Sequence, residues 1–209
     1  MTHLTQITLD LATAARLGLR DSYDWHQAVW KAFPGHDGEP RDFLTRLDQR
    51  REGFRLLVVS PQPPIRPEWC PEGAECWKTK MIPQTYFTRT RYAFQLCANP
   101  TRKISKELPG GTPTKNGRRV PLRSREELVE WLVRKSTQGG FTVDEGTLRT
   151  FSRGRAYFEK KGQTGLHSAV EFQGVLTVID PAKFHDAFTR GIGSAKAFGF
   201  GLLVIAPIS

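Results

Sequence analysis

The fold of this chain is constrained most by an order of strand-like and helix-like segments that occurs twice along its 209 residues. In the first half, residues 4–11 (LTQITLDL) alternate apolar and polar side chains, as a half-buried strand does. A helix pattern follows over residues 23–33. Residues 42–50 and 53–60 then predict a β-hairpin, and residues 91–99 predict a further alternating strand.

The second half repeats this order with a longer helix. Ser124 opens a capping-box pattern ahead of a helix that ends near Gly139-Gly140. After it, strands are expected at about 141–152, 155–160 and 167–179, a helix at 182–189 and a last strand at 202–206. Because each half approaches the order βαββαβ, the sequence predicts an α+β fold of two tandem ferredoxin-like domains.

A segment rich in glycine and proline separates the two halves. Residues 100–119 hold six of these residues and little apolar content, which is typical of a linker or a long exposed loop. The sequence therefore predicts an N-terminal domain over residues 1–103, a linker over residues 104–117 and a C-terminal domain over residues 118–209.

The positive charge of the chain is concentrated in two segments. There are 31 Lys and Arg against 21 Asp and Glu, which gives a net charge of +10. Residues 101–119 carry +5 and residues 152–162, expected to form a second basic loop, carry +3. Positive charge concentrated in this way indicates a partner with a phosphate backbone, most simply a nucleic acid. The alternative is that both segments are merely solvated basic loops.

A glycine-rich run, GIGSAKAFGFG, lies between the last predicted helix and the last predicted strand. It lacks the strand-to-helix context of a dinucleotide fingerprint and the GK[ST] of a phosphate-binding loop. Its glycines, Gly191, Gly193, Gly199 and Gly201, would let backbone N–H groups approach phosphate oxygens, and Lys196 would add a positive charge. The alternative is a connection whose glycines serve only tight packing.

Several other classes of protein are disfavoured by the sequence. No run of 18 apolar residues could span a membrane, and the first 20 residues do not form a secretory signal. The three cysteines, Cys70, Cys76 and Cys97, suit a cytoplasmic chain with reduced thiols. Because no second Cys or His pair follows Cys70 and Cys76 at a metal-ligand spacing, we expect no metal site and no cofactor.

Short motifs follow one another in an order that matches one protein family. They are YDWHQAVW from Tyr23 with Phe33-Pro34, RDFL from Arg41, FQLCANPTRK from Phe94, RVPL from Arg119, FQGVLTV from Phe172, and the glycine-rich run. As an ordered set they resemble the CasE family, the CRISPR-RNA endoribonucleases of type I-E Cascade, within the RAMP superfamily. The resemblance covers nearly the whole chain.

This resemblance implies metal-independent cleavage of the repeat stem-loop of precursor CRISPR RNA at the 3′ base of its stem. It also implies that the partner is this hairpin RNA and that the chain is a subunit of a Cascade-type effector complex. No association with a membrane is implied. Two alternatives stay open. Many RAMP proteins bind RNA without cutting it, so the chain could be a non-catalytic RNA-binding subunit of a ribonucleoprotein complex. A general DNA- or ribosome-binding domain is the third possibility.

RNA cleavage without a metal proceeds by attack of a ribose 2′-OH on its own phosphate, and it needs a base, an acid and cations. Histidine suits the proton transfers because its ordinary pKa lies near neutrality. His26 follows Tyr23 by three residues, on one face of a helix, and the resemblance implies that this pair is catalytic. From the residues alone, a histidine on so apolar a helix is more often structural than catalytic. The remaining histidines show no partner pattern and are expected to be structural or at the surface: His3, His36, His167 and His185.

The predicted RNA-binding residues come from the two basic segments and the glycine-rich run. They are Arg102, Lys103, Arg118, Arg119, Ser152, Arg153, Arg155, Lys160, Lys161, Gly191, Gly193, Lys196, Gly199 and Gly201. A basic hairpin of this kind could hold both phosphate walls of an A-form groove, because such contacts depend on shape and charge. The catalytic helix is thus predicted in the N-terminal domain and most of the RNA-binding residues in the C-terminal domain.

Overall fold

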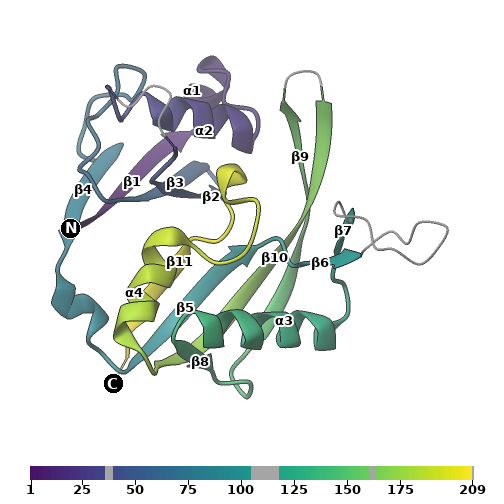
Figure 1. Cartoon of the computed structure of the whole chain (residues 1–209). Coiled ribbons are helices and arrows are strands. Elements are labelled where there is room, and N and C mark those ends of the chain that lie inside the picture. The colour runs from purple at the N-terminus through teal and green to yellow at the C-terminus, as the bar shows by residue number, and fades with distance from the viewer. Residues whose placement is uncertain (36–39, 105–117, 161–162, 209) are drawn as a thin grey trace.

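The computed structural model describes residues 1–35, 40–104, 118–160 and 163–208, which form two larger antiparallel sheets and one two-stranded ribbon (Figure 1). The strands of the first sheet are β1 (Thr2–Asp10), β2 (Leu44–Arg50), β3 (Gly53–Ser60) and β4 (Trp77–Ile82). Their order is β2-β3-β1-β4, and every neighbouring pair is antiparallel. Two short helices, α1 (Leu11–Arg16) and α2 (Ser22–Trp30), connect β1 to β2.

The second sheet repeats this strand order in the second half of the chain. Its strands are β5 (Arg91–Ala98), β8 (Phe141–Val143), β9 (Arg149–Lys160), β10 (Gln163–Val178) and β11 (Leu203–Pro207). The order is β11-β5-β10-β8, and β9 also pairs with β10. Helices α3 (Arg125–Gln138) and α4 (Pro181–Arg190) make the two crossovers. Because both sheets have the order expected of interleaved strand–helix–strand units, the α+β fold of two tandem ferredoxin-like halves is confirmed.

The two halves differ in one crossover. Residues 61–76, all of which the structure describes, form turns and loop where the second helix of the first half would lie. The Pro-rich sequence of this stretch explains the difference, because proline removes a backbone donor and interrupts a helix. A single short 3₁₀ helix, η1 (Gln84–Phe87), follows β4 and leads into β5.

The strand at residues 91–98 corrects the predicted domain boundary. The sequence placed it in the N-terminal domain, residues 1–103, but β5 is a central strand of the second sheet, between β10 and β11. Its long-range partners, such as Phe172 opposite Leu96, decide this membership, and no local pattern reports them. The chain therefore passes from one sheet to the other between β4 and β5.

The predicted linker over residues 104–117 lies outside the described residues except for Ile104. Ile104 ends β6 (Thr101–Ile104), which pairs with β7 (Arg118–Pro121) to form the two-stranded ribbon. The two ends of this segment are thus held side by side in a ladder that runs from Thr101 opposite Pro121 to Ile104 opposite Arg118.

The prediction of a loop over the second basic segment, residues 152–162, is wrong for its residues up to Lys160, whereas the strand expected at 155–160 is confirmed. Its residues up to Lys160 belong to β9, which pairs with β10 over most of its length. Gly154 has φ +81, and the ladder shifts register between Ser168 and Val170. A β-bulge of this kind lets a strand continue through an irregular step instead of ending there.

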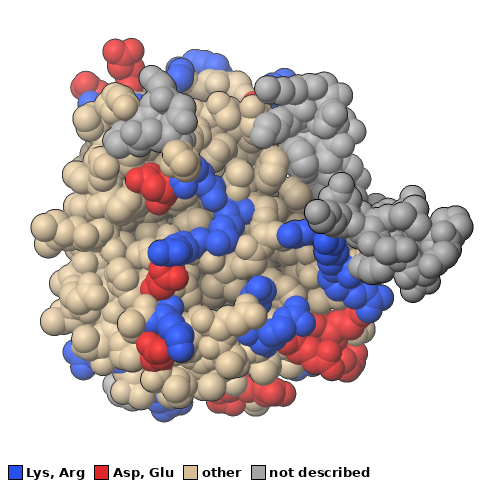
Figure 2. Space-filling view, in the orientation of Figure 1, with Lys and Arg blue, Asp and Glu red and all other residues tan. Residues whose placement is uncertain are grey.

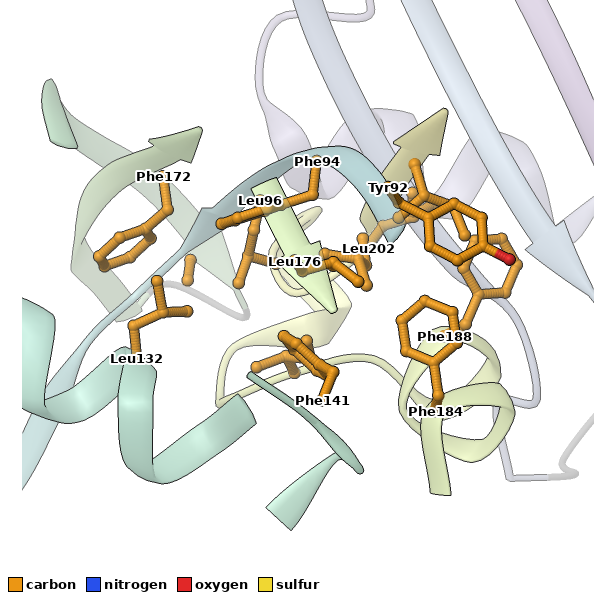
Figure 3. Close-up of a cluster of buried hydrophobic side chains, with 14 of the residues drawn as sticks. Tyr92, Phe94, Leu96, Leu132, Phe141, Phe172, Leu176, Phe184, Phe188 and Leu202 are labelled. Carbon is orange, nitrogen blue, oxygen red and sulfur yellow. The ribbon is translucent and has the colours of Figure 1, made fainter. Parts of the chain in front are cut away.

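The two faces of the first sheet pack into two different apolar cores. Trp25 and Val29 of α2 pack with Ile7, Leu56 and other residues on one face. On the opposite face, alternating residues such as Leu57 and Val59 join the core of the second half. In that larger core, side chains of β5 and β10, such as Phe172, pack with side chains of α3 and α4, such as Leu132 and Phe184 (Figure 3). The first sheet is therefore fixed on the second half while α2 stays on its outer face.

Candidate nucleic-acid interface and active site

The structure brings together three of the regions that the sequence singled out. Helix α2 packs against β9 and against η2 (Lys196–Phe198), a 3₁₀ turn inside the glycine-rich run. In Figure 1, η2 lies beside α2 and the β9–β10 hairpin rises alongside them. The helix that carries Tyr23 and His26 therefore lies where the glycine-rich run and the basic strand meet.

His26 is buried, with 8% of its surface exposed. The indole N–H of Trp30, one turn later on α2, donates to Nε2 of His26 over 3.2 Å. The ring of Phe43 lies 5.6 Å from the His26 ring, between centroids. An N–H donor directed at Nε2 requires a lone pair there, so this geometry holds His26 as the neutral imidazole.

Tyr23 lies in the first turn of α2, three residues before His26, and is half-buried. The start of this helix is fixed by Asp21, whose carboxylate accepts hydrogen bonds from the N–H groups of Tyr23 (2.8 Å) and Asp24 (2.9 Å). Such an N-cap satisfies donors that a helix otherwise leaves open. The cap therefore sets the position from which the Tyr23 side chain leaves the backbone.

Two cations lie close to this helix. The guanidinium of Arg41 lies 6.0 Å from the centre of the Phe43 ring, the same ring that contacts His26. Its Nη1 is buried and has no hydrogen-bond partner among the described residues. Nζ of Lys196 donates to the carbonyl oxygen of Arg190 over 2.7 Å. Burial lowers the pKa of Lys196, and the positive charge of Arg41 lowers it further.

Arg41 was not predicted as a site residue, although its motif RDFL was recognised as a family landmark. An arginine two residues before an aromatic residue, in the segment that leads into β2, carries no distinctive local pattern. What marks it is spatial: a buried guanidinium nitrogen without a hydrogen-bond partner among the described residues, and an electrostatic effect on Lys196, which is far away in the sequence. Such a group is a ready partner for a phosphate oxygen.

A cavity of about 900 Å³ opens next to the glycine-rich run. Three exposed arginines, Arg119, Arg123 and Arg125, line it together with Ser152 of β9 and the backbone around Ser194. Figure 2 shows Lys and Arg side chains in a band across this face of the molecule, interrupted by acidic ones. A hollow lined by exposed arginines and hydroxyl groups has the composition expected of a phosphate-binding surface.

His167, expected to be structural or at the surface, is half-buried in the wall of this cavity. Its Nδ1 lies 3.0 Å from the side-chain amide of Asn99, and its ring packs against Phe198 and Phe200. Burial lowers the pKa of His167, which favours the neutral ring at pH 7. These contacts agree with a structural role in joining β10 to the glycine-rich run.

The other predicted RNA-binding residues are spread over several elements. Arg102 of β6 is exposed and pairs with Glu127 of α3 over 2.9 Å, and its neighbour Lys103 is also exposed. Oγ of Ser152 accepts a hydrogen bond from the N–H of Gly154 (3.3 Å). Arg153 is partly exposed and contacts a buried carboxylate, as described below. The remaining predicted basic residues lie outside the described residues, wholly or in their side chains: Arg118, Arg155, Lys160 and Lys161.

The glycine-rich run packs tightly against the rest of the protein. Gly201 has φ +87, and a Cβ there would lie 2.6 Å from the carbonyl oxygen of Ile192. A Cβ at Gly191 would lie 2.9 Å from the side chain of Leu44 on β2. The packing alternative therefore accounts for these two glycines. Contact between the run and RNA stays a prediction.

Among the residues that the structure describes, no cluster of three or more His, Cys, Asp or Glu side chains could hold a metal ion. No helix there is long and apolar enough to cross a membrane. All three cysteines are free thiols, and burial raises the pKa of Cys70 and of Cys97 to about 11. Thiolate chemistry at these two positions is therefore disfavoured near neutral pH.

Known proteins are similar to this chain along nearly its whole length. The model of the CRISPR associated protein family matches residues 2–207. The chain is 34% identical over 199 residues to the CRISPR system Cascade subunit CasE of Escherichia coli, which covers 93% of this chain and 96% of that protein. It is 33% identical over 219 residues to the CRISPR-associated endoribonuclease Cse3 of Thermus thermophilus, which covers 98% of this chain and 99% of that protein.

A solved structure extends the similarity to three dimensions. It is a structure of the CRISPR endoribonuclease Cse3 bound to a 19-nucleotide RNA, with a TM-score of 0.79 and 28% identity. The match covers 98% of this chain and all of that one.

Proposed function

The chain belongs to the CasE family of CRISPR-associated proteins, and from this premise we propose that it is an endoribonuclease that cuts the repeat stem-loop of precursor CRISPR RNA at its 3′ base. The observation that carries the proposal is the position of α2, which lies against both the glycine-rich run and the basic strand β9. The relatives named as an endoribonuclease and as a Cascade subunit support the same activity and setting.

In the proposed reaction, the ribose 2′-oxygen forms a bond to the adjacent phosphorus and the bond from phosphorus to the 5′-oxygen breaks. The 2′ proton passes to a base, and the leaving 5′-oxygen takes up a proton. The products are a 2′,3′-cyclic phosphate and a 5′-hydroxyl end. General acid–base catalysis of such steps contributes typically about 10²- to 10⁴-fold.

His26 is proposed as the group that moves the proton. The hydrogen bond from Trp30 supports its neutral form, which is the form a general base requires. Bound RNA would have to replace this hydrogen bond for Nε2 to accept the 2′ proton. Tyr23 is proposed to orient the 2′-OH or the phosphate through its hydroxyl, because an ordinary tyrosine titrates too high to be an easy base.

Arg41 and Lys196 are proposed to stabilise the charge on the pentacoordinate phosphorus. Both lie beside the α2 helix, and the buried Nη1 of Arg41 has donor capacity that no described residue uses. Donors fixed in advance where charge develops contribute more than mobile ones in water. The exposed arginines of the cavity would hold the stem at its phosphates, in agreement with shape-based recognition of A-form RNA.

The setting follows from the same premise. We propose that the chain serves as a subunit of a Cascade-type effector complex in the cytoplasm. In this view the first half supplies the cutting helix, and the second half, which begins with β5, holds the hairpin.

One observation favours a second candidate, a non-catalytic RNA-binding subunit. His26 is 8% exposed and engaged by Trp30, as a structural histidine would be. In that case the arginine-lined cavity would bind the hairpin and α2 would only pack against it.

A single-turnover assay with a panel of repeat hairpin RNAs in EDTA tests the proposal. We expect one hairpin to be cut at the base of its stem, with a 2′,3′-cyclic phosphate at the new end. A requirement for added metal would contradict the 2′-OH mechanism. Tight binding of a hairpin without any product would select the non-catalytic alternative.

A further inference from the structure

Five charged side chains form a cluster between the two halves of the molecule. This charge cluster consists of Arg46, Asp48, Arg55, Arg153 and Glu171. The side chains of Arg46 and Glu171 are 2% and 1% exposed. Charges so deeply buried are costly unless they are paired, so the pairing inside the cluster shows which segments it connects.

Glu171 lies at the centre of the cluster, and its two carboxylate oxygens face two different arginines. Its Oε1 accepts a hydrogen bond from Nη2 of Arg46 over 2.9 Å, and its Oε2 lies 3.3 Å from Nε of Arg153. Arg46 also donates to Asp48 over 2.9 Å, and Asp48 pairs with Arg55 over 2.6 Å. One carboxylate on β10 thus joins an arginine of the first sheet to an arginine of β9.

The two arginines belong to different parts of the proposed machinery. Arg46 is on β2. This strand directly follows the segment that contains Phe43, whose ring lies against His26. Arg153 is on β9, the basic strand that packs against α2, and 42% of its side chain is exposed. Because an arginine has five N–H donors, Arg153 can keep its Nε toward Glu171 and present its Nη groups to a phosphate.

Arg46 and Glu171, at the centre of the cluster, are buried, whereas Arg153 at its edge is 42% exposed. Burial, and after it Glu171, raises the pKa of the adjacent Cys97 thiol to about 11. Burial would raise the pKa of Asp48, but Arg46 and Arg55 bring it below its ordinary value. Apolar side chains of similar volume would often stabilise an interface as well as buried ion pairs do, so stability alone does not account for this cluster.

We propose that Glu171 is a positioning residue for RNA cleavage, which holds the phosphate-binding Arg153 of β9 in register with the first sheet and its His26 helix. The proposal rests on the proposed function. RNA that binds Arg153 is thereby placed at a fixed distance from α2. A displacement of about 1 Å at a reacting centre can cost on the order of 100-fold in rate.

Glu171→Gln tests this role, with the hairpin RNA that the unaltered protein cuts as the probe. At saturating RNA, we expect the single-turnover cleavage rate to fall about 10- to 100-fold. The RNA dissociation constant should stay equal or decrease, because a negative charge beneath the binding surface is removed and Arg153 is released. A slower rate together with unaltered or tighter binding is not expected from a general loss of structure. Glu72→Gln makes the same chemical change at an exposed ion pair with Arg66, and both constants should stay unchanged.

A second variant keeps the proposal testable if Glu171→Gln does not fold, which circular dichroism melting will show. Arg153→Gln removes the same link from the exposed side. If Arg153 only bound phosphate, its loss would weaken binding and leave the rate at saturation unaltered. We expect instead that the saturated rate falls as in Glu171→Gln, and that the double variant loses no more. Unaltered saturated rates in both folded variants would overturn the positioning role. A wild-type protein that cuts no hairpin would instead contradict the proposed function.

Discussion

Helix α2 and the arginine-lined cavity lie in different halves of the chain and differ in exposure and in charge. Asp24 is the one ionised side chain of α2, and Trp25, His26 and Val29 are buried. The cavity presents three exposed arginines, and the described residues that line it include no Asp or Glu. Proton transfer benefits from a site where water is excluded, whereas binding of a phosphate backbone needs exposed cations. The two regions are therefore suited to different tasks, α2 to cutting the RNA and the cavity to holding it.

The largest effect is expected at His26. His26→Ala should lower the single-turnover rate about 10²- to 10⁴-fold, because it removes the proposed acid–base group. The RNA dissociation constant should change less than about twofold, since the phosphate-binding cations remain. Gln27→Ala, at an exposed position on the same helix, is the control. A His26→Ala protein that cleaves at the parental rate would remove α2 from the chemistry.

Arg41 should show the next largest effect. Arg41→Ala is expected to slow cleavage about 10²-fold at saturating RNA, because it removes a donor near the developing phosphate charge. The control Arg51→Ala makes the same charge change at an exposed turn between β2 and β3. Equal effects of the two substitutions would mean that Arg41 acts only through net charge.

The cavity should control affinity with little influence on rate. In Arg119→Gln/Arg123→Gln we expect weaker binding and a slope of log Kd against log salt that is smaller by about one for each lost phosphate contact. The rate at saturating RNA should stay near the parental value. Binding measured over a series of salt concentrations checks this, with the exposed Arg16→Gln on α1 as the control. An unaltered slope would place the RNA elsewhere.

The smallest effect is expected at the helix caps, where the two halves can be compared directly. Asp21 caps α2 and Ser124 caps α3 through a capping box. Asp21→Ala and Ser124→Ala should each lower the free energy of unfolding by about 1 kcal/mol, from the loss of a capping hydrogen bond. Only Asp21→Ala should also slow cleavage, because it loosens the helix that carries Tyr23. Thermal melting and the cleavage assay together decide this, and equal rates in both variants would contradict it.

Local patterns in the sequence predicted most of the fold but not how its strands associate. The hairpin of β2 and β3, the capping box of α3 and the helix α4 follow from alternation and capping residues. Strand β4 was missed because its middle residues, Lys78 to Met81, are exposed and show no apolar alternation. The sheet to which β5 belongs depends on partners such as Phe172, which only the folded chain brings close.

For the candidate site too, the sequence predicted what is local and missed what depends on distant residues. The sequence named His26 and Tyr23 because their motif is local, and the structure places both on one helix beside β9. It did not point to Arg41 or Glu171, since neither has a meaningful neighbour in the sequence. Arg41 stands out through Lys196, and Glu171 through Arg46, which is 125 residues away in the chain. Charges that act through distant partners leave no periodic pattern.

The ribbon of β6 and β7 has a consequence for altering this protein. Its ladder closes the chain from Thr101 to Ile104 against Arg118 to Pro121, and the N–H of Leu122 donates to the carbonyl oxygen of Pro100. The path of the chain through both sheets is therefore complete without the segment that the ribbon encloses. A peptide tag or a second binding module inserted there would be carried as a side branch, next to the arginine-lined cavity and without any change in the spacing between the two halves.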